Sequence, residues 1–294
     1  MMKKLTILIF SVLTASFSFA QCPLENTAFK GGEHLTYNLY YNWKFVWVKA
    51  GTASMSTVQS NYKGKAAWRA SLITRGNDKV DQYFVLRDTL LSYSTLDLAP
   101  LYYKKAAREG KRYYIDEVFY DYAGGKANVR QHRKKADGDS DWLKKSYGEC
   151  VFDMLTMFVR ARSFDPSNWK KDHTIDFKMI DGNSCEPARI VYRGKSTIKG
   201  DNGVKYRCLQ LSYMELDDGK YKRIVDFYVT DDQNHIPVRL DMFLKFGSAK
   251  AFIVSIKGNK STISSIARSM SSAYVPSPNS LVVLVTLARY SGVP

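Results

Sequence analysis

The sequence lacks the motifs by which common enzyme and metal sites are recognised. Its four histidines, His34, His132, His173 and His235, are scattered, and no His-x-Glu, His-x-x-x-His or Cys-x-x-Cys spacing occurs. The Gly-x-Ser-x-Gly elbow of many hydrolases and a glycine-rich phosphate loop are also missing. We therefore predict no catalytic residue, no metal site and no cofactor, and we favour a protein that is not an enzyme.

Long apolar runs are also missing, apart from one short run at the start of the chain. Two lysines among the first four residues precede an apolar run from Leu5 to Phe19, which ends in small residues at Ser18 and Ala20. This arrangement predicts a secretory signal peptide over residues 1–20. The run is shorter than the ~20 residues that cross a bilayer. Gln21 before Cys22 is atypical of a lipid-modified cysteine, so we expect export without a lipid anchor.

Acidic residues are scarce relative to basic ones. The chain has 44 Lys and Arg against 28 Asp and Glu, a formal net charge of +16. Such a charge could suit an anionic partner, but the basic residues are spread along the chain except for a cluster over residues 130–135. Because an exported protein rarely meets nucleic acid, we predict no nucleic-acid partner and interpret the charge as a solvated basic surface.

Only four cysteines occur, Cys22, Cys150, Cys185 and Cys208, and all lie in the exported part of the chain. An even number in an oxidising compartment favours disulfides over metal binding or catalysis. We predict a Cys185–Cys208 disulfide, because these residues flank two adjacent strand-like runs. We also predict a Cys22–Cys150 disulfide between the N-terminus and the start of a helix. Free buried thiols are the alternative.

Strand patterns dominate the rest of the sequence. Residues 35–41 alternate between apolar and polar in a period of two, and similar runs recur about every ten residues. Turns separate them, such as the one that holds Asp231 and Asp232, whose carboxylates we interpret as structural. The pattern predicts a mainly β fold, a single large curled antiparallel sheet or open barrel-like roll over residues 21–262. We expect residues 263–294 to be a poorly ordered or atypical tail.

One helix is expected, at about 146–165, because this segment is apolar over most of its circumference. Ser146 and Glu149 have the spacing of a capping box at its start. Such a helix is normally buried, so we place it at the centre of the curled sheet. Asp153 and Arg162 would lie on opposite helix faces, and we expect each to find a structural partner in the surrounding sheet.

Aromatic residues are concentrated near the first strand. The alternation of a strand predicts that Tyr41, Trp43, Phe45 and Trp47 share one face. With Trp68 of a later strand, these are our candidate ligand-binding residues, because aromatics on the concave side of a sheet can hold lipid, sugar or apolar peptide. The alternative is that they pack against the buried helix as part of the core.

Three groups of residues resemble a known family. They are Gly32–Tyr37 followed by Lys49–Ala53, then the helix residues Asp153, Leu155, Thr156 and Arg162, and finally Tyr228–Asp232 with Ile236–Leu240. Together they resemble the bacterial exported family known as domain of unknown function 3108, over residues 31–257. The resemblance implies an envelope protein of antiparallel β architecture, in the periplasm or outer-membrane periphery of a Gram-negative bacterium. It supplies no established activity, so no catalytic residue is carried over.

Two hypotheses about function follow. The first is a binding or carrier protein that holds an apolar or amphipathic envelope molecule, such as a lipid, in its curled sheet. The second is a structural or protein-interaction component of the periplasm or outer membrane that has no small ligand.

Overall fold

The computed structural model describes residues 22–43, 46–244 and 247–266, and most of them lie in β-strands. The prediction of a mainly β fold is confirmed. The predicted signal peptide, residues 1–20, lies outside the described residues, as does the predicted tail from residue 267 onward. The first part of that tail is described, and Ser265–Ile266 forms a short strand that pairs with Lys205 and Tyr206.

Long strands joined by tight turns form the first half of the chain. They are β1 (Glu33–Trp43), β2 (Val46–Tyr62), β3 (Lys65–Gly76), β4 (Leu86–Ser94), β5 (Pro100–Glu109), β6 (Arg112–Ala123), β7 (Lys126–Lys135) and β8 (Ser140–Tyr147). A short helix, α1 (Asp78–Asp81), lies between β3 and β4. Each of these strands pairs antiparallel with its neighbour in sequence, as the alternating patterns and short turns predict.

The second half repeats this arrangement after one short strand and one helix. Its elements are β9 (Val151–Asp153), α2 (Met154–Ala161), β10 (Thr174–Asp181), β11 (Ser184–Lys199), β12 (Lys205–Asp217), β13 (Lys220–Thr230), β14 (Pro237–Phe243), β15 (Ser248–Lys257) and β16 (Ser265–Ile266). The last long strand, β15, pairs with β1 and so joins the two halves into one sheet. Only β9 and β10 pair in parallel among the described strands.

The connection between β8 and β9 shows that this sheet is rolled. In the order of the strands, β8 lies at one edge and β9 at the other, with thirteen strands between them. A flat sheet of that size would be about 65 Å wide. Yet β8 ends at Tyr147 and β9 begins at Val151, a separation that the chain can span only up to about 14 Å. The two edges therefore approach each other, and the sheet is barrel-like and nearly closed.

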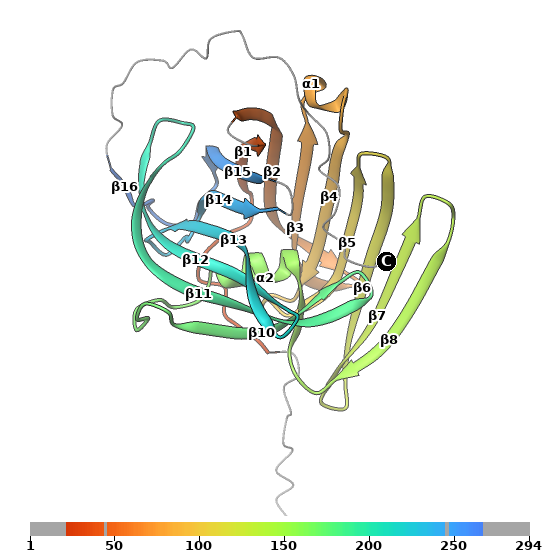
Figure 1. The fold of residues 1–294 in the computed structure, drawn as a ribbon. Coiled ribbons are helices and arrows are strands. Elements are labelled where there is room, and N and C mark those ends of the chain that lie inside the picture. The colour runs from red at the N-terminus through yellow and green to blue at the C-terminus, as the bar shows by residue number, and fades with distance from the viewer. Residues whose placement is uncertain (1–21, 44–45, 245–246, 267–294) are drawn as a thin grey trace, which may run out of the picture.

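Helix α2 lies inside the rolled sheet, where Figure 1 shows it between the strands of the two halves. Its position agrees with the prediction of a central buried helix, but its predicted bounds are wrong. Ser146 belongs to β8, where it pairs with Asn128, so it does not cap a helix. The helix begins after Asp153, whose carboxylate accepts a hydrogen bond from the Thr156 amide at 2.8 Å.

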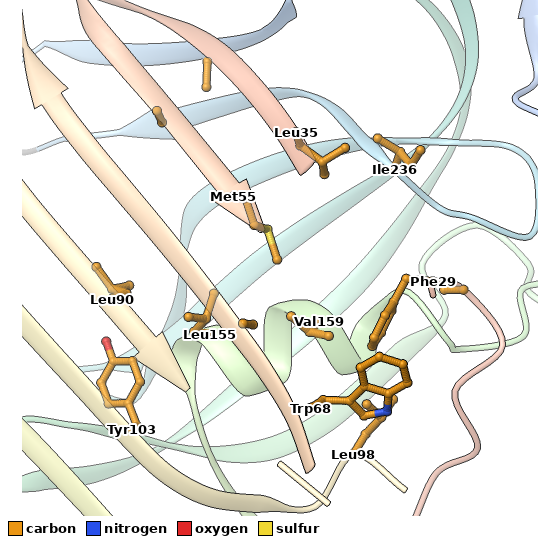
Figure 2. Packing of buried hydrophobic residues seen from close by; sticks show 14 of the residues in the cluster. Phe29, Leu35, Met55, Trp68, Leu90, Leu98, Tyr103, Leu155, Val159 and Ile236 are labelled. Carbon is orange, nitrogen blue, oxygen red and sulfur yellow. The ribbon is translucent and has the colours of Figure 1, made fainter. Parts of the chain in front are cut away.

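The apolar side of α2 forms part of the main core. Leu155 and Val159 are 2% and 4% exposed, and Figure 2 shows both among side chains of the first strands, including Met55 and Leu90. Beside them, the rings of Phe29 and Trp68 meet edge to face with centroids 5.0 Å apart. The N-terminal segment that carries Phe29 therefore closes the core next to the helix.

One of the two predicted disulfides is present. Cys22 and Cys150 are bonded, with Cα atoms 6.0 Å apart, so the N-terminal segment is tied to the residue before β9. The predicted Cys185–Cys208 disulfide is wrong, because both thiols are free. Cys208 lies opposite Ser196 of β11, and eleven residues of that strand, about 36 Å, separate Ser196 from Cys185. The two cysteines occupy opposite ends of the hairpin.

Candidate ligand-binding cavity

The inner face of the rolled sheet and α2 enclose a cavity of about 510 Å³. Most of its wall is apolar, and the strands of both halves contribute to it. Representative residues are Leu39, Met55, Leu72, Leu211, Phe227 and Leu240. Folded proteins normally fill their interiors closely, and binding sites for small molecules commonly have volumes of about 300–1,000 Å³. The volume of this cavity falls within that range, and its lining is mostly apolar.

Helix α2 lines one part of the cavity as well as filling the core. Met154, Met157 and Phe158 reach the wall from the helix. The Phe158 ring lies 5.5 Å from that of Phe227 on β13. Methionine side chains are flexible and polarisable, so they can adapt to ligands of different shape. The residues of α2 are therefore placed to contact whatever occupies the cavity.

Arg162, which follows α2, is held by buried polar partners. Its guanidinium donates to both carboxylate oxygens of Glu33 on β1, at 2.5 and 2.9 Å, and also to the carbonyl oxygen of Asn234. Both side chains of the ion pair are almost fully buried. This pair fixes the C-terminal end of the helix to the sheet.

The N-terminal end of α2 depends on Asp153. Its carboxylate accepts hydrogen bonds from the amide and hydroxyl of Thr156, both at 2.8 Å, and from the Tyr120 hydroxyl at 3.4 Å. Burial raises its pKa to about 6, although these hydrogen bonds oppose the rise. Asp153 thus caps the helix and contacts β6 through Tyr120.

Asp231 and Asp232 lie in the turn between β13 and β14, away from the cavity wall. The Asp232 carboxylate accepts hydrogen bonds from Asn234 and from the Ser264 amide. Asp231 forms an ion pair with Lys195 of β11 at 2.8 Å. These contacts organise the turn and attach the segment after β15 to it.

The aromatic residues near the first strand do not share one face, so that prediction is wrong. Strand β2 pairs antiparallel with β1. Tyr41 lies opposite Val48, and Asn42 lies opposite Trp47. Directly opposed residues of an antiparallel pair project to the same side. Tyr41 and Trp47 therefore lie on opposite faces of the sheet.

Tyr41 is the predicted ligand-binding residue that the structure places on the cavity wall. It is 5% exposed and lines the cavity. Trp47 is 42% exposed, and the Lys250 ammonium lies 4.4 Å from its ring centroid. Since both Trp47 and Lys250 project from the outer face, Trp47 makes no contact with the cavity.

The other predicted aromatics divide into two cases. Trp68 is 7% exposed and packs in the core against Phe29, outside the cavity wall. Phe45 and the side chain of Trp43 lie outside the described residues. Trp68 is therefore a core residue, which was the alternative to ligand binding for these aromatic residues.

The sequence predictions missed a charged group on the wall. Asp88 of β4 and Lys105 and Glu109 of β5 all line the cavity. A signal for Asp88 is present in the sequence, since it lies between Leu86 and Leu90 in an inward-facing alternation. Sequence alone could not show that Lys105 and Glu109 project to the same place, because that requires the pairing of β4 with β5.

The charged groups on this wall affect each other's protonation. Burial and the neighbouring Glu109 raise the pKa of Asp88 to about 7, with Lys105 acting in the opposite direction. Burial alone would lower the pKa of Lys105, but Tyr114, Asp181 and Glu109 together raise it. Lys105 is therefore protonated at neutral pH, while Asp88 changes charge near it.

Within residues 22–43, 46–244 and 247–266, no three His, Cys, Asp or Glu side chains are grouped so that they could hold a metal ion. No helix in this part of the chain is long and apolar enough to cross a membrane.

The fold and the cavity define an all-β protein in which a nearly closed, barrel-like sheet surrounds one short helix and an apolar cavity. The chain belongs to the family described as "Protein of unknown function (DUF3108)", whose model matches residues 36–254. The resemblance stated from the sequence motifs is thereby confirmed. No curated protein matches the sequence.

Two solved structures are similar to this chain at low sequence identity. The beta-barrel-like protein of domain of unknown function DUF1849 from Brucella abortus superposes with a TM-score of 0.53 and 11% identity, covering 78% of this chain and 98% of that one. An exported protein with a YmcC-like fold from Bacteroides fragilis has a TM-score of 0.34 and 8% identity, over 80% of this chain and 100% of its own. At such identities, the first likeness shows the fold alone and the second carries no argument.

Proposed function

We propose that this protein binds or carries an apolar or amphipathic molecule of the cell envelope, such as a lipid, inside its rolled sheet. The observation that carries the proposal is the apolar cavity of about 510 Å³. Apolar side chains around an unfilled space gain free energy when an apolar ligand replaces water there. The predicted signal peptide supports a location outside the cytoplasm, in the periplasm or at the outer-membrane periphery.

The proposed role is not enzymatic. The buried charged residues nearest to α2 already have structural partners, Arg162 with Glu33 and Asp153 with Thr156 and Tyr120. Buried charges need such partners for stability alone. A carrier requires only an apolar space of suitable size and a way for its ligand to enter and leave.

The test uses a neutral apolar dye, N-phenyl-1-naphthylamine, whose fluorescence rises in an apolar site. Ala53 lines the cavity and is 8% exposed, so Ala53→Phe places a ring in the cavity space. Ala66, on the neighbouring strand, is exposed, so Ala66→Phe is the matched control. We expect the wild type and Ala66→Phe to bind the dye and Ala53→Phe to bind it much more weakly, with all three folded by circular dichroism.

Native mass spectrometry of protein purified from its own envelope gives an independent measurement. A co-purifying lipid that Ala53→Phe lacks would support the proposal. Absence of both dye binding and co-purifying lipid in the wild type would contradict it and would favour a structural or protein-interaction role.

A further inference from the structure

The cavity wall and the rest of the protein differ in the sign of their charge. The chain carries a formal net charge of +16. The Asp, Glu, Lys and Arg side chains that line the cavity are Asp88, Glu109, Asp181, Glu215, Lys105 and Arg162. Arg162 is already neutralised by Glu33. Carboxylates therefore outnumber the remaining cation, Lys105, inside a protein whose surface is strongly basic.

Among the charged side chains that line the cavity, Asp88 is the one whose position indicates a contact with a ligand. It lies opposite Thr74 of β3 and Ala107 of β5, between two apolar leucines of its own strand. Its Oδ1 atom is buried and has no hydrogen-bond donor. A buried acceptor without a donor is costly, and such groups in folded proteins are usually satisfied by water or a ligand.

The nearby cation does not satisfy this oxygen. The Lys105 ammonium lies 3.8 Å from a carboxylate oxygen of Glu109 and 5.1 Å from the centre of the Tyr114 ring. Lys105 is thus engaged by other groups of β5 and β6. An anionic ligand at this place would meet the carboxylates of Asp88, Glu109 and Asp181, and Lys105 is the cation of the cavity wall beside them.

We propose that the cavity takes an amphiphile with an ammonium head group, which donates to the Asp88 carboxylate while the apolar chain occupies the cavity. This inference rests on the proposed function and specifies its ligand class. A charge-assisted hydrogen bond from an ammonium to a partly buried carboxylate is about twice as strong as a neutral one. The apolar wall would supply most of the affinity, and Asp88 would supply discrimination between head groups.

The interaction depends on the ionisation of Asp88. Glu109 and Lys105 of β5 face it, and Asp181 of β10 and Tyr114 of β6 act on it through Lys105. Because the pKa of Asp88 is raised to about 7, its carboxyl is mostly neutral at pH 6 and mostly ionised at pH 8. Affinity for an ammonium amphiphile should rise between these values, whereas affinity for a neutral alcohol should not change.

The experiment is displacement of N-phenyl-1-naphthylamine by dodecylammonium, dodecanol and dodecanoate, below their micelle concentrations, at pH 6 and pH 8. At pH 8 we expect dodecylammonium to bind about tenfold or more tightly than dodecanoate, a difference equivalent to one charge-assisted hydrogen bond. Asp88→Asn should remove most of this preference. Asp121→Asn, an exposed position on β6, is the matched control.

The outcomes separate the two proposals. If the wild type neither binds the dye nor carries a co-purifying lipid, the proposed function fails and this inference fails with it. If the dye binds but the three amphiphiles bind equally, or if the preference survives in Asp88→Asn, the ammonium inference alone is wrong. Should Asp88→Asn lose dye binding through misfolding, Asp88→Ser replaces it, and a preference that survives in that variant overturns the inference.

Discussion

The buried ion pair between Glu33 and Arg162 gives the sharpest prediction about stability. The two side chains are 1% and 2% exposed and share two hydrogen bonds, at 2.5 and 2.9 Å. Glu33→Gln keeps the shape of the side chain but removes its charge. The Arg162 cation then stays buried with neutral acceptors, the amide oxygen of the substituted side chain and the carbonyl oxygen of Asn234 in the turn between β13 and β14.

Breaking a buried pair by removing one partner typically costs about 3–5 kcal/mol. The Phe29 ring lies 5.6 Å from the Arg162 guanidinium in the wild type, and because Glu33→Gln does not remove this cation–π contact, it does not enter the difference. Natural domains are stable by about 5–15 kcal/mol, so the variant should lose a large share of its stability. For a domain of this size, the melting temperature should fall by roughly 6–20 °C.

Urea unfolding of the mature protein, followed by tryptophan fluorescence, measures the effect. The matched control is Glu149→Gln, which removes an exposed ion pair with Lys178 and should cost less than about 1 kcal/mol. A double variant, Glu33→Leu with Arg162→Met, should be more stable than Glu33→Gln, because it leaves no unpaired charge. If Glu33→Gln and Glu149→Gln are equally stable, the ion pair does not anchor the helix as described.

Three further predictions concern the core, the disulfide and the cavity wall. Leu155→Ala should lower the free energy of unfolding by ~2–5 kcal/mol, against less than ~1 kcal/mol for Met154→Ala, which is 46% exposed; equal urea midpoints would contradict this. Replacing Cys22 and Cys150 together with serine should cost about 5 kcal/mol, because the bond closes a loop with a sequence separation of 128; an unchanged midpoint relative to the oxidised wild type would refute it. The pKa of Asp88, raised to about 7, means that the folded state favours the neutral acid. The free energy of unfolding of the wild type, compared with that of Asp88→Asn, should therefore be highest below about pH 4. This difference should be lost as the pH rises through 7, by up to about 4 kcal/mol. If the free energies of unfolding of the wild type and Asp88→Asn change in parallel with pH, Asp88 titrates normally and the prediction is wrong.

The strand content was predictable because it depends on local pattern. Alternation of apolar and polar residues, with turn residues between runs, specifies strands that are buried on one face, and the structure confirms the antiparallel β architecture. The Cys22–Cys150 disulfide was also predicted. The Cys185–Cys208 disulfide was not formed because adjacency of two strands does not bring the ends of a long hairpin together.

The start of the helix was mispredicted for a related reason. Ser146 and Glu149 have a valid capping spacing, but pairing with β7 holds Ser146 in a strand. Long-range pairing thus outweighed a local signal that is worth only about 1 kcal/mol. The aromatic residues illustrate the same point, since the antiparallel pairing of β2 with β1 placed Tyr41 and Trp47 on opposite faces.

The sequence by itself determined the secondary-structure class, the apolar character of the central helix and the pattern predicted for export, because each depends on residues near one another in the chain. Only the tertiary structure decided which side chains of each strand project to the concave side of the rolled sheet. Alternation distinguishes the two faces of a strand but does not say which one turns inward when a sheet rolls. That choice brought Asp88, Lys105 and Tyr41, which lie on three different strands, to the wall of one cavity.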